Sequence, residues 1–317
     1  MPSIDMPLAE LREYKPPLTR QPDFASFWDG NLDALRREPL SMKLAPQWSP
    51  WKGFNLYELT CAGAGGGAIA GELLVPRGAA KAPGVVVYHG YSGARNPAHT
   101  VLHWAAMGAV VLSVDVRGQR GKSSDNAAYP GPKHPGFVTA GLEDPRTYYF
   151  RNVYLDAVRA VDALVAHDEV DVNKLAVTGI SQGGALSLAA AALDPRVALC
   201  MSEVPFMCDF PRSVNVTGQA AYGEISNYLR RCGQEEIART FQTLSYFDNV
   251  NLAGMVRART LISVGLCDPL CPPSGIFAAY NHLACRRQIE VYPYMGHESN
   301  TAFTELCMRE MAKEFGM

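Results

Sequence analysis

The chain has 317 residues, of which 48% are hydrophobic, and its formal net charge is -2. This length fits one large α/β domain or two smaller ones. The charge balance and the lack of a Lys/Arg-rich block predict no nucleic-acid partner and no anionic membrane partner. No run of about 18 apolar residues occurs, which predicts no membrane span. The N-terminus carries acids and prolines instead of the basic and then apolar stretches of a signal peptide, so we expect a cytoplasmic protein.

The first 50 or so residues predict a helical arm. Phe24, Phe27, Trp28 and Leu32 recur there at helical spacing. Two β-like runs follow at residues 54–63 and 67–76, with a glycine-rich turn at 63–67 between them, which predicts a hairpin.

From residue 84 onward, strand-like and helix-like segments alternate. The strands are expected at residues 84–88, 109–116, 175–180, 197–204, 260–265 and 288–292, and the helices at 98–107, 150–166, 182–192 and 299–315. Such alternation favours a mostly parallel sheet with helices on both faces. The alternation lapses between about 205 and 255, where we expect a cap-like helical insertion, although a surface excursion also fits. The whole chain, 1–317, is read as one α/β domain.

The strongest motif is Gly-Ile-Ser-Gln-Gly at residues 179–183, a G-x-S-x-G sequence. A strand enters it and a helix leaves it, as a nucleophile elbow requires. The flanking glycines suit a turn in which side chains would clash. Ser181 is therefore the candidate nucleophile, with a helix N-terminus facing the developing negative charge.

A serine hydroxyl needs an adjacent base, and the base needs a carboxylate that fixes its tautomer. His297 follows the last expected strand, and Asp268 follows the strand at 260–265, so both would face the elbow from the same sheet edge. Asp248 is the runner-up for the carboxylate. The order Ser, Asp, His is that of α/β-hydrolases, which is the fold class we predict.

The oxyanion of an acyl-transfer intermediate needs two N–H donors. Gln182, directly after the nucleophile, is expected to supply one, and Tyr91 in the glycine-bearing loop 89–93 the other. His89 in that loop suits a structural or oxyanion-loop role. Arg117 follows a strand, so its side chain could reach the site or brace its loop, and bracing is the preferred interpretation.

Eight cysteines are spread through the chain and are mostly expected to pack as small apolar residues. A disulfide between Cys267 and Cys271 stays open at this point. No zinc-ligand spacing, G-x-G-x-x-G motif or P-loop is present, so neither a metal nor a cofactor is predicted.

Together these residues resemble carbohydrate esterase family seven, the acetyl xylan esterases and cephalosporin C deacetylases. The resemblance covers most of the chain and rests on five motifs, at residues 88–91 (YHGY), 117–119 (RGQ), 144–149 (DPRTYY), 179–183 (GISQG) and 297–298 (HE). It implies a Ser181, Asp268, His297 triad and an oxyanion hole shaped by Tyr91 and Gln182. It also implies that acetyl groups are removed from short substituted sugars and from cephalosporin C, and that the chain forms a homohexamer with residues 130–147 as an interface loop.

The residues alone indicate only a carboxylester hydrolase. A serine peptidase of the prolyl-oligopeptidase type has the same order of triad residues. Such peptidases usually carry an additional propeller domain, for which this chain leaves no room. A non-catalytic binding relative would have lost a triad residue. The physiological ester and the pH optimum stay open. We expect Tyr91, Pro205 and Phe206 to wall a pocket for an acetyl group, since all three lie near strand ends at the edge that carries Ser181.

Overall fold

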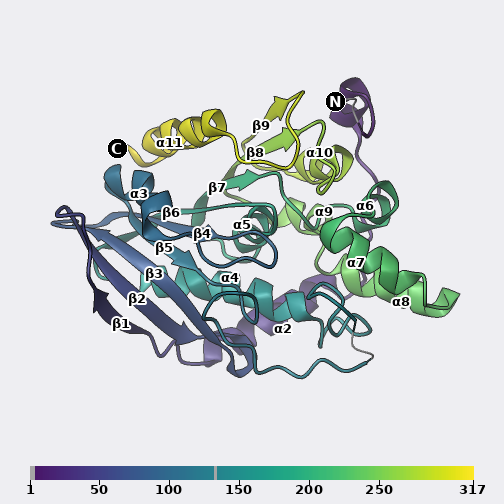
Figure 1. Ribbon diagram of the computed structural model, residues 1–317, viewed down its shortest axis with the longest axis horizontal. Helices are drawn as coiled ribbons and strands as arrows, with labels where there is room; N and C mark the ends of the chain where they lie inside the picture. Colours follow the sequence, from purple (N-terminus) through teal and green to yellow (C-terminus); the bar gives the residue numbers. More distant parts are fainter. Residues whose placement is uncertain (1–3, 132–133) are drawn as a thin grey trace.

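The computed structural model describes residues 4–131 and 134–317 and is built around one nine-stranded sheet (Figure 1). The strand order is β1-β2-β3-β5-β4-β6-β7-β8-β9. The first three strands and β5 pair antiparallel, and the remaining pairs, from β5 through β9, are parallel. The predicted α/β-hydrolase fold is thus confirmed. The strands are β1 (Lys43–Gln47), β2 (Phe54–Ala62), β3 (Ala68–Pro76), β4 (Ala82–Tyr88), β5 (Val110–Val114), β6 (Val170–Ile180), β7 (Val197–Glu203), β8 (Arg259–Gly265) and β9 (Arg287–Tyr292).

The central strands are apolar on both faces because helices cover both sides of the sheet. In β4, Val85 and Val87 pack into one core cluster, whereas Val86 and Tyr88 pack into the other. The first cluster includes α3 (Ala98–Ala106) and α11 (Thr301–Phe315), and the second includes α4 (Tyr149–Val165) and α5 (Gln182–Leu193). Because successive side chains of a strand point to opposite faces of the sheet, one apolar strand contributes to both core clusters.

The expected hairpin is present as β2 and β3, which pair in register from Phe54 opposite Pro76 to Ala62 opposite Ala68. The turn contains a short 3-10 helix, η1 (Ala64–Gly66). Gly65 and Gly66 have φ angles of 59° and 81° there. Glycine enters this left-handed region without a Cβ clash, which explains the glycine-rich turn.

The N-terminal arm differs from the expectation, because it is not helical throughout. It begins with α1 (Leu8–Glu13) and α2 (Phe24–Arg37), but the segment after α2 forms β1, an edge strand on β2. Trp28 in α2 is fully buried, donates a hydrogen bond to the Tyr246 carbonyl at 3.1 Å and stacks on Tyr154 at 5.9 Å. The arm is therefore part of the core packing.

The insertion between β7 and β8 consists of four helices and a 3-10 turn beside the carboxyl ends of the strands (Figure 1). They are α6 (Phe210–Val216), α7 (Ala220–Leu229), α8 (Gln234–Ser245), α9 (Asn249–Leu252) and η2 (Ala253–Met255). A further helix that the sequence reading did not anticipate, α10 (Pro273–His282), joins β8 to β9.

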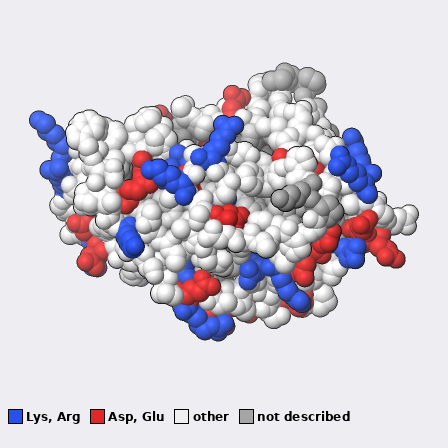
Figure 2. All heavy atoms as spheres, turned by 60° about the horizontal axis from the view of Figure 1, so that its bottom comes forward, with Lys and Arg blue, Asp and Glu red and all other residues white. Residues whose placement is uncertain are grey.

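The surface is mixed in charge on the face drawn in Figure 2, where basic and acidic side chains are interspersed without a large patch of one sign. Among the described helices, none has the length and apolar character needed to cross a bilayer.

Candidate active site

Ser181 stands at a sharp turn between β6 and α5, with φ of 60° and ψ of -116°. The two glycines of the motif make the turn sterically possible. A Cβ on Gly179 would lie 2.4 Å from the Tyr88 carbonyl oxygen, and one on Gly183 would lie 2.1 Å from the same oxygen. Since such contacts are forbidden, the sequence around Ser181 specifies the elbow locally.

His297 and Asp268 form a hydrogen-bonded pair beside the elbow. The distance from His297 Nδ1 to Asp268 Oδ2 is 2.8 Å, and Asp268 is fully buried. Because a carboxylate only accepts, His297 donates from Nδ1 and its Nε2 lone pair is free to act as a base.

The carboxylate of Asp268 is fixed on its other side by its own loop. Oδ1 accepts the backbone N–H groups of Leu270 at 2.8 Å and Cys271 at 2.9 Å. The His297 loop is held against this one by the hydrogen bond from Cys267 N to the Met295 carbonyl, at 3.0 Å. A Cβ on Gly265 would lie 2.5 Å from that carbonyl oxygen, so glycine permits the close approach of the two loops.

The hydroxyl of Ser181 interacts with the thiol of Cys271. The hydrogen bonds of the described residues do not include one between Ser181 and His297. Catalytic hydrogen bonds are often long or misaligned until substrate is bound, so the lack of this contact is compatible with His297 as the base of Ser181. Burial raises the pKa of the Cys271 thiol well above its usual range, and nearby Asp268 raises it further, so the thiol stays protonated.

A cavity of about 330 Å³ opens on these groups. Phe206 contributes to its wall, as expected, but Pro205 is not among its lining residues. Pro205 is buried and its Cα lies 3.2 Å from where a Gly184 Cβ would be, so it packs against the helix behind the elbow instead. The lining residues are Gly90, Tyr91, Ile180, Ser181, Phe206, Ala220, Ala221, Leu270, Cys271 and His297.

The two expected oxyanion donors have free backbone N–H groups. In the described part of the chain, neither Tyr91 N nor Gln182 N donates to a protein acceptor. Gln182 is the first residue of α5, where a helix leaves its N–H groups unpaired. Tyr91 lines the same cavity as Ser181. Both N–H groups are thus available to a developing oxyanion.

The side chain of Gln182 is locked by the Arg-Gly-Gln motif. Gln119 Nε2 lies 2.8 Å from Gln182 Oε1, and Gln182 Nε2 lies 3.2 Å from Gln119 Oε1, so the two amides pair reciprocally. Both side chains are buried. This contact, which sequence reasoning missed, links the motif at 117–119 to the residue after the nucleophile.

His89 has a structural place in the loop, as expected. The Val116 N–H donates to His89 Nε2 at 2.9 Å, so the proton must be on Nδ1, which lies 2.7 Å from the Gly90 carbonyl. Burial lowers the pKa of His89, so the ring stays neutral and keeps this tautomer.

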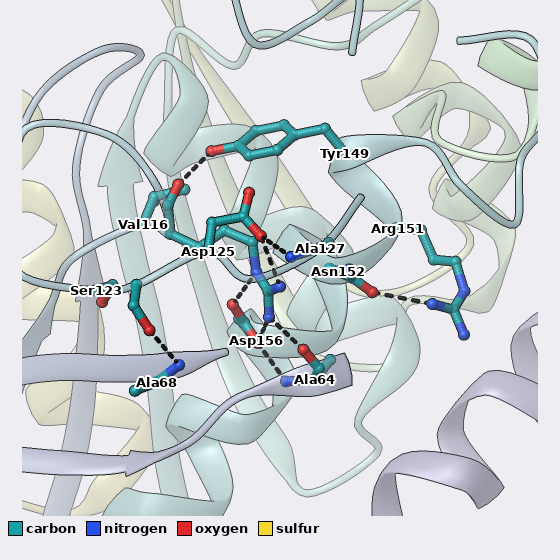
Figure 3. Close-up of polar contacts among 12 residues, drawn as sticks. Ala64, Ala68, Val116, Ser123, Asp125, Ala127, Tyr149, Arg151, Asn152 and Asp156 are labelled. Atoms are coloured by element: carbon teal, nitrogen blue, oxygen red, sulfur yellow. Dashed lines mark hydrogen bonds and ion pairs between the residues drawn. The ribbon is translucent and has the colours of Figure 1, made fainter. Parts of the chain in front are cut away.

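Arg117 braces its loop, as the sequence indicated. Its fully buried guanidinium meets Asp156 in a bidentate pair at 2.6 and 2.7 Å, and donates to the Ala64 carbonyl at 2.8 Å (Figure 3). Asp125 lies 3.3 Å away, and the Tyr149 hydroxyl donates to the Arg117 carbonyl at 2.6 Å. These contacts join the hairpin turn, the loop after β5 and α4 around one buried charge.

Asp248, the runner-up for the third member, lies elsewhere in the fold. Its carboxylate accepts the backbone N–H groups of Asp209, Phe210 and Val250 at 2.8 to 2.9 Å. Burial raises its pKa to about 7. Asp248 therefore ties the insertion together at the starts of α6 and α9.

The structure places no disulfide between Cys267 and Cys271. Asp268, Cys271 and His297 each present a ligand atom within 4.8 Å of the others. The tetrahedral bonds of zinc set its ligand atoms about 3.3–3.8 Å apart, and the pair between His297 and Asp268 already occupies one atom of each residue. We derive no metal site from this group.

A strained serine on a strand-to-helix turn, with a buried Asp–His pair at the same sheet edge, defines a serine hydrolase of the α/β-hydrolase class. Comparisons with known proteins narrow that class. A family model described as acetyl xylan esterase (AXE1) matches residues 1–314. The chain belongs to this family, as the resemblance in its sequence indicated, and is a serine carboxylester hydrolase.

Three relatives illustrate the similarity. The acetyl esterase Axe7A of Xylanibacter ruminicola is 28% identical over 301 residues, which cover 92% of this chain and 67% of that protein. An acetyl xylan esterase from Paenibacillus sp. R4 is 42% identical, with a TM-score of 0.95 over 97% of this chain and 99% of that one. Acetyl xylan esterase 1 from Thermoanaerobacterium sp. JW/SL YS485 is 36% identical, with a TM-score of 0.93 over 98% and 99% of the two chains.

Proposed function

We propose that this chain removes acetyl groups from acetylated xylooligosaccharides and from cephalosporin C. The observation that carries the proposal is that Ser181, His297 and Tyr91 line one cavity. In addition, the backbone N–H groups of Tyr91 and of Gln182, directly after Ser181, donate to no acceptor among the described residues. The names of the three relatives support the acetylated substrate. The chemistry needs no group beyond these side chains, the backbone and water.

The reaction proceeds through an acetyl-enzyme. His297 Nε2 takes the proton from the Ser181 hydroxyl as its oxygen attacks the acetyl carbonyl carbon. The N–H groups of Tyr91 and Gln182 bind the resulting oxyanion. The intermediate collapses as His297 protonates the sugar oxygen that leaves. Water, deprotonated by His297, then attacks the acetyl-Ser181 carbonyl, and acetate is released with the proton returned to Ser181.

The cavity favours a short acyl chain. Tyr91 and Phe206 stand with ring centroids 6.3 Å apart, and Phe206 packs against Tyr222 at 4.7 Å, so this part of the wall is rigid. Pro205, expected from the sequence to contribute, is replaced in the wall by Leu270 and Cys271. An extra methylene that clashes with such a wall loses both binding and alignment of the carbonyl.

We expect the rate constant kcat/KM to fall steeply with acyl length. Across p-nitrophenyl acetate, butyrate and octanoate, the loss should exceed about 100-fold, since misalignment of the reacting carbon alone costs that much. The leaving group is the same in all three esters, so the comparison isolates the acyl side. Release of acetate from acetylated xylooligosaccharides and cephalosporin C tests the alcohol side. Equal turnover of octanoate and acetate would contradict the deacetylase assignment.

The two alternative functions can be tested with the same purified protein. A peptidase of the prolyl-oligopeptidase type would cleave a Pro-p-nitroanilide, and a non-catalytic relative would cleave neither this compound nor p-nitrophenyl acetate. Our proposal requires hydrolysis of the acetate ester alone.

We also propose that the chain assembles into a homo-oligomer, a hexamer, with residues 130–147 at the interface. The resemblance to family seven supports this. The connection between β5 and α4 is long and holds only turns, bends and one isolated bridge in its described part, which excludes residues 132–133. Long ordered connections in compact domains usually serve a partner or a function. Multi-angle light scattering should give six times the chain mass of 34.5 kDa, and a monomer at working concentration would refute the assembly.

A further inference from the structure

The hydroxyl of Tyr91 joins three segments that are far apart in the sequence. It donates to Glu224 Oε2 at 2.6 Å, and it accepts the backbone N–H groups of Phe137 at 2.7 Å and Val138 at 3.0 Å. Tyr91 belongs to the loop after β4, Glu224 to α7 of the insertion, and the two N–H groups to the connection before α4. A phenolic oxygen donates one hydrogen bond and accepts up to two, so all of its capacity is used here.

The side chain of Tyr91 is well suited to hold this position. Burial raises the pKa of its phenol, and the neighbouring Glu224 carboxylate raises it further, so the hydroxyl stays protonated and keeps donating. The ring packs edge-on against Phe137 at 5.9 Å, and Phe137 in turn packs against Tyr149 at 5.4 Å. Tyr149 is hydrogen-bonded to the loop of Arg117.

The carboxylate of Glu224 packs closely against the loop that contains Gly136. A Cβ on Gly136 would lie 1.8 Å from Glu224 Oε2, so a side chain at this position would displace the carboxylate, and the φ of 93° at Gly136 favours glycine. The Val138 N–H also interacts with this carboxylate. The contact is therefore part of the loop's folded geometry, and a hydrogen bond to a charged acceptor at this length is among the stronger kinds.

The backbone N–H of Tyr91 is one of the two groups proposed for the oxyanion hole, and Tyr91 lines the same cavity as Ser181. Its loop is otherwise rich in glycine, with Gly90 and Gly93 on either side of Tyr91 and Ser92. Because a peptide bond is planar, the Tyr91 N–H shares a plane with the Gly90 carbonyl, which accepts the His89 Nδ1–H at 2.7 Å and the Gly93 N–H at 3.1 Å. The hydrogen bonds of the Tyr91 side chain add a restraint from outside the loop, just as Gln119 restrains the side chain of Gln182.

We propose that Glu224 is a positioning residue for catalysis. By accepting the hydrogen bond of the Tyr91 hydroxyl from the insertion, it holds Tyr91 in place and, together with the contacts of the Gly90 carbonyl, keeps the Tyr91 N–H directed into the oxyanion hole. The proposal rests on the proposed esterase function. If Glu224 has this role, the insertion affects kcat as well as the shape of the cavity. Its helix α7 lines the cavity through Ala220 and Ala221 and also holds Tyr91 through Glu224.

The test compares Glu224→Ala, Tyr91→Phe and the double variant on p-nitrophenyl acetate. Tyr91→Phe keeps the ring and the backbone N–H but removes the hydroxyl. Each single variant should lower kcat by about 10- to 100-fold with KM changed less than about 3-fold, because a misdirected donor weakens only the transition state. The double variant should be no slower than the slower single one, since both remove the same contact.

Two further variants control for charge and folding. Glu224→Gln keeps an acceptor oxygen for the Tyr91 hydroxyl and should retain kcat within about 5-fold of wild type. Glu235→Ala removes an exposed carboxylate from the neighbouring helix α8 and should leave kcat unchanged. If Glu224→Ala does not fold, a lower kcat in Tyr91→Phe together with a nearly normal kcat in Glu224→Gln still supports the positioning role of the hydrogen bond between Tyr91 and Glu224.

The outcomes are distinguishable. An inactive wild type would refute the proposed function itself. With an active wild type, full kcat in Tyr91→Phe or in folded Glu224→Ala would overturn the positioning role. Independent losses that multiply in the double variant would also overturn it. A lowered melting temperature with unchanged kcat per folded molecule would mean that the contact stabilises the fold without acting on catalysis.

Discussion

Ser181→Ala is expected to abolish ester hydrolysis while leaving the fold intact. The substitution removes only the hydroxyl oxygen, and alanine has to adopt the φ of 60° that Ser181 already has. Without a nucleophile, neither the acetyl-enzyme nor the proton transfer to His297 can occur. Loss of a nucleophilic serine in such a triad costs about 10⁴- to 10⁶-fold in kcat. The rate with p-nitrophenyl acetate measures this, and circular dichroism checks the fold.

The matched control is Ser187→Ala, which changes another fully buried serine on α5. Its hydroxyl donates to the Gly183 carbonyl inside the helix and does not reach the cavity, so activity should persist. A serine-directed phosphonate should label wild type and Ser187→Ala, but not Ser181→Ala. Most of the activity surviving in Ser181→Ala would overturn the assignment of the nucleophile.

Asp268→Asn is expected to lower kcat by about 10⁴-fold, because it reverses the tautomer of the catalytic histidine. The backbone N–H groups of Leu270 and Cys271 would hold the amide oxygen where Asp268 Oδ1 now lies. The amide NH₂ would then face His297 Nδ1 and donate to it. The proton of the ring would move to Nε2, which could no longer take the proton of Ser181.

Asp248→Asn provides the control, since this second buried aspartate also accepts backbone N–H groups. It lies outside the cavity, so the variant should keep its turnover per folded molecule while its melting temperature falls. The reverse result, an inactive Asp248→Asn and an active Asp268→Asn, would restore Asp248 as the third member of the triad.

Much of this site could be predicted because its determinants are local. The elbow at residues 179–183 requires glycine on both sides of Ser181 for steric reasons, so five consecutive residues are enough to predict it. Asp268 and His297 were predicted to lie together because strand ends of a parallel sheet meet at one edge, and the two side chains do form a hydrogen bond. The same logic placed Asp248 second, since it follows no strand.

Other features depend on contacts that the sequence does not encode locally. The prediction of a helical arm missed β1, because an edge strand with polar residues has no clear apolar alternation and forms only against β2. Pro205 and Phe206 were both expected in the cavity wall, but only Phe206 lines it, because Pro205 packs against the start of α5 behind the elbow. Cys271 was expected to pack as an apolar residue, yet it lines the cavity beside Ser181.

The sequence by itself therefore determined the alternation of strands and helices, the elbow, and the residues that carry the proposed chemistry. Short-range sterics and periodic burial act within one segment, so each of these leaves a local pattern. Only the tertiary structure decided what holds those residues in place. Arg117 meets Asp156 39 positions away, Gln119 meets Gln182 63 positions away, and Tyr91 meets Glu224 133 positions away. Such partners are brought together by the order of the strands and by the packing of the insertion. The sequence around a polar side chain in a loop or helix does not indicate which distant group will form its hydrogen bond.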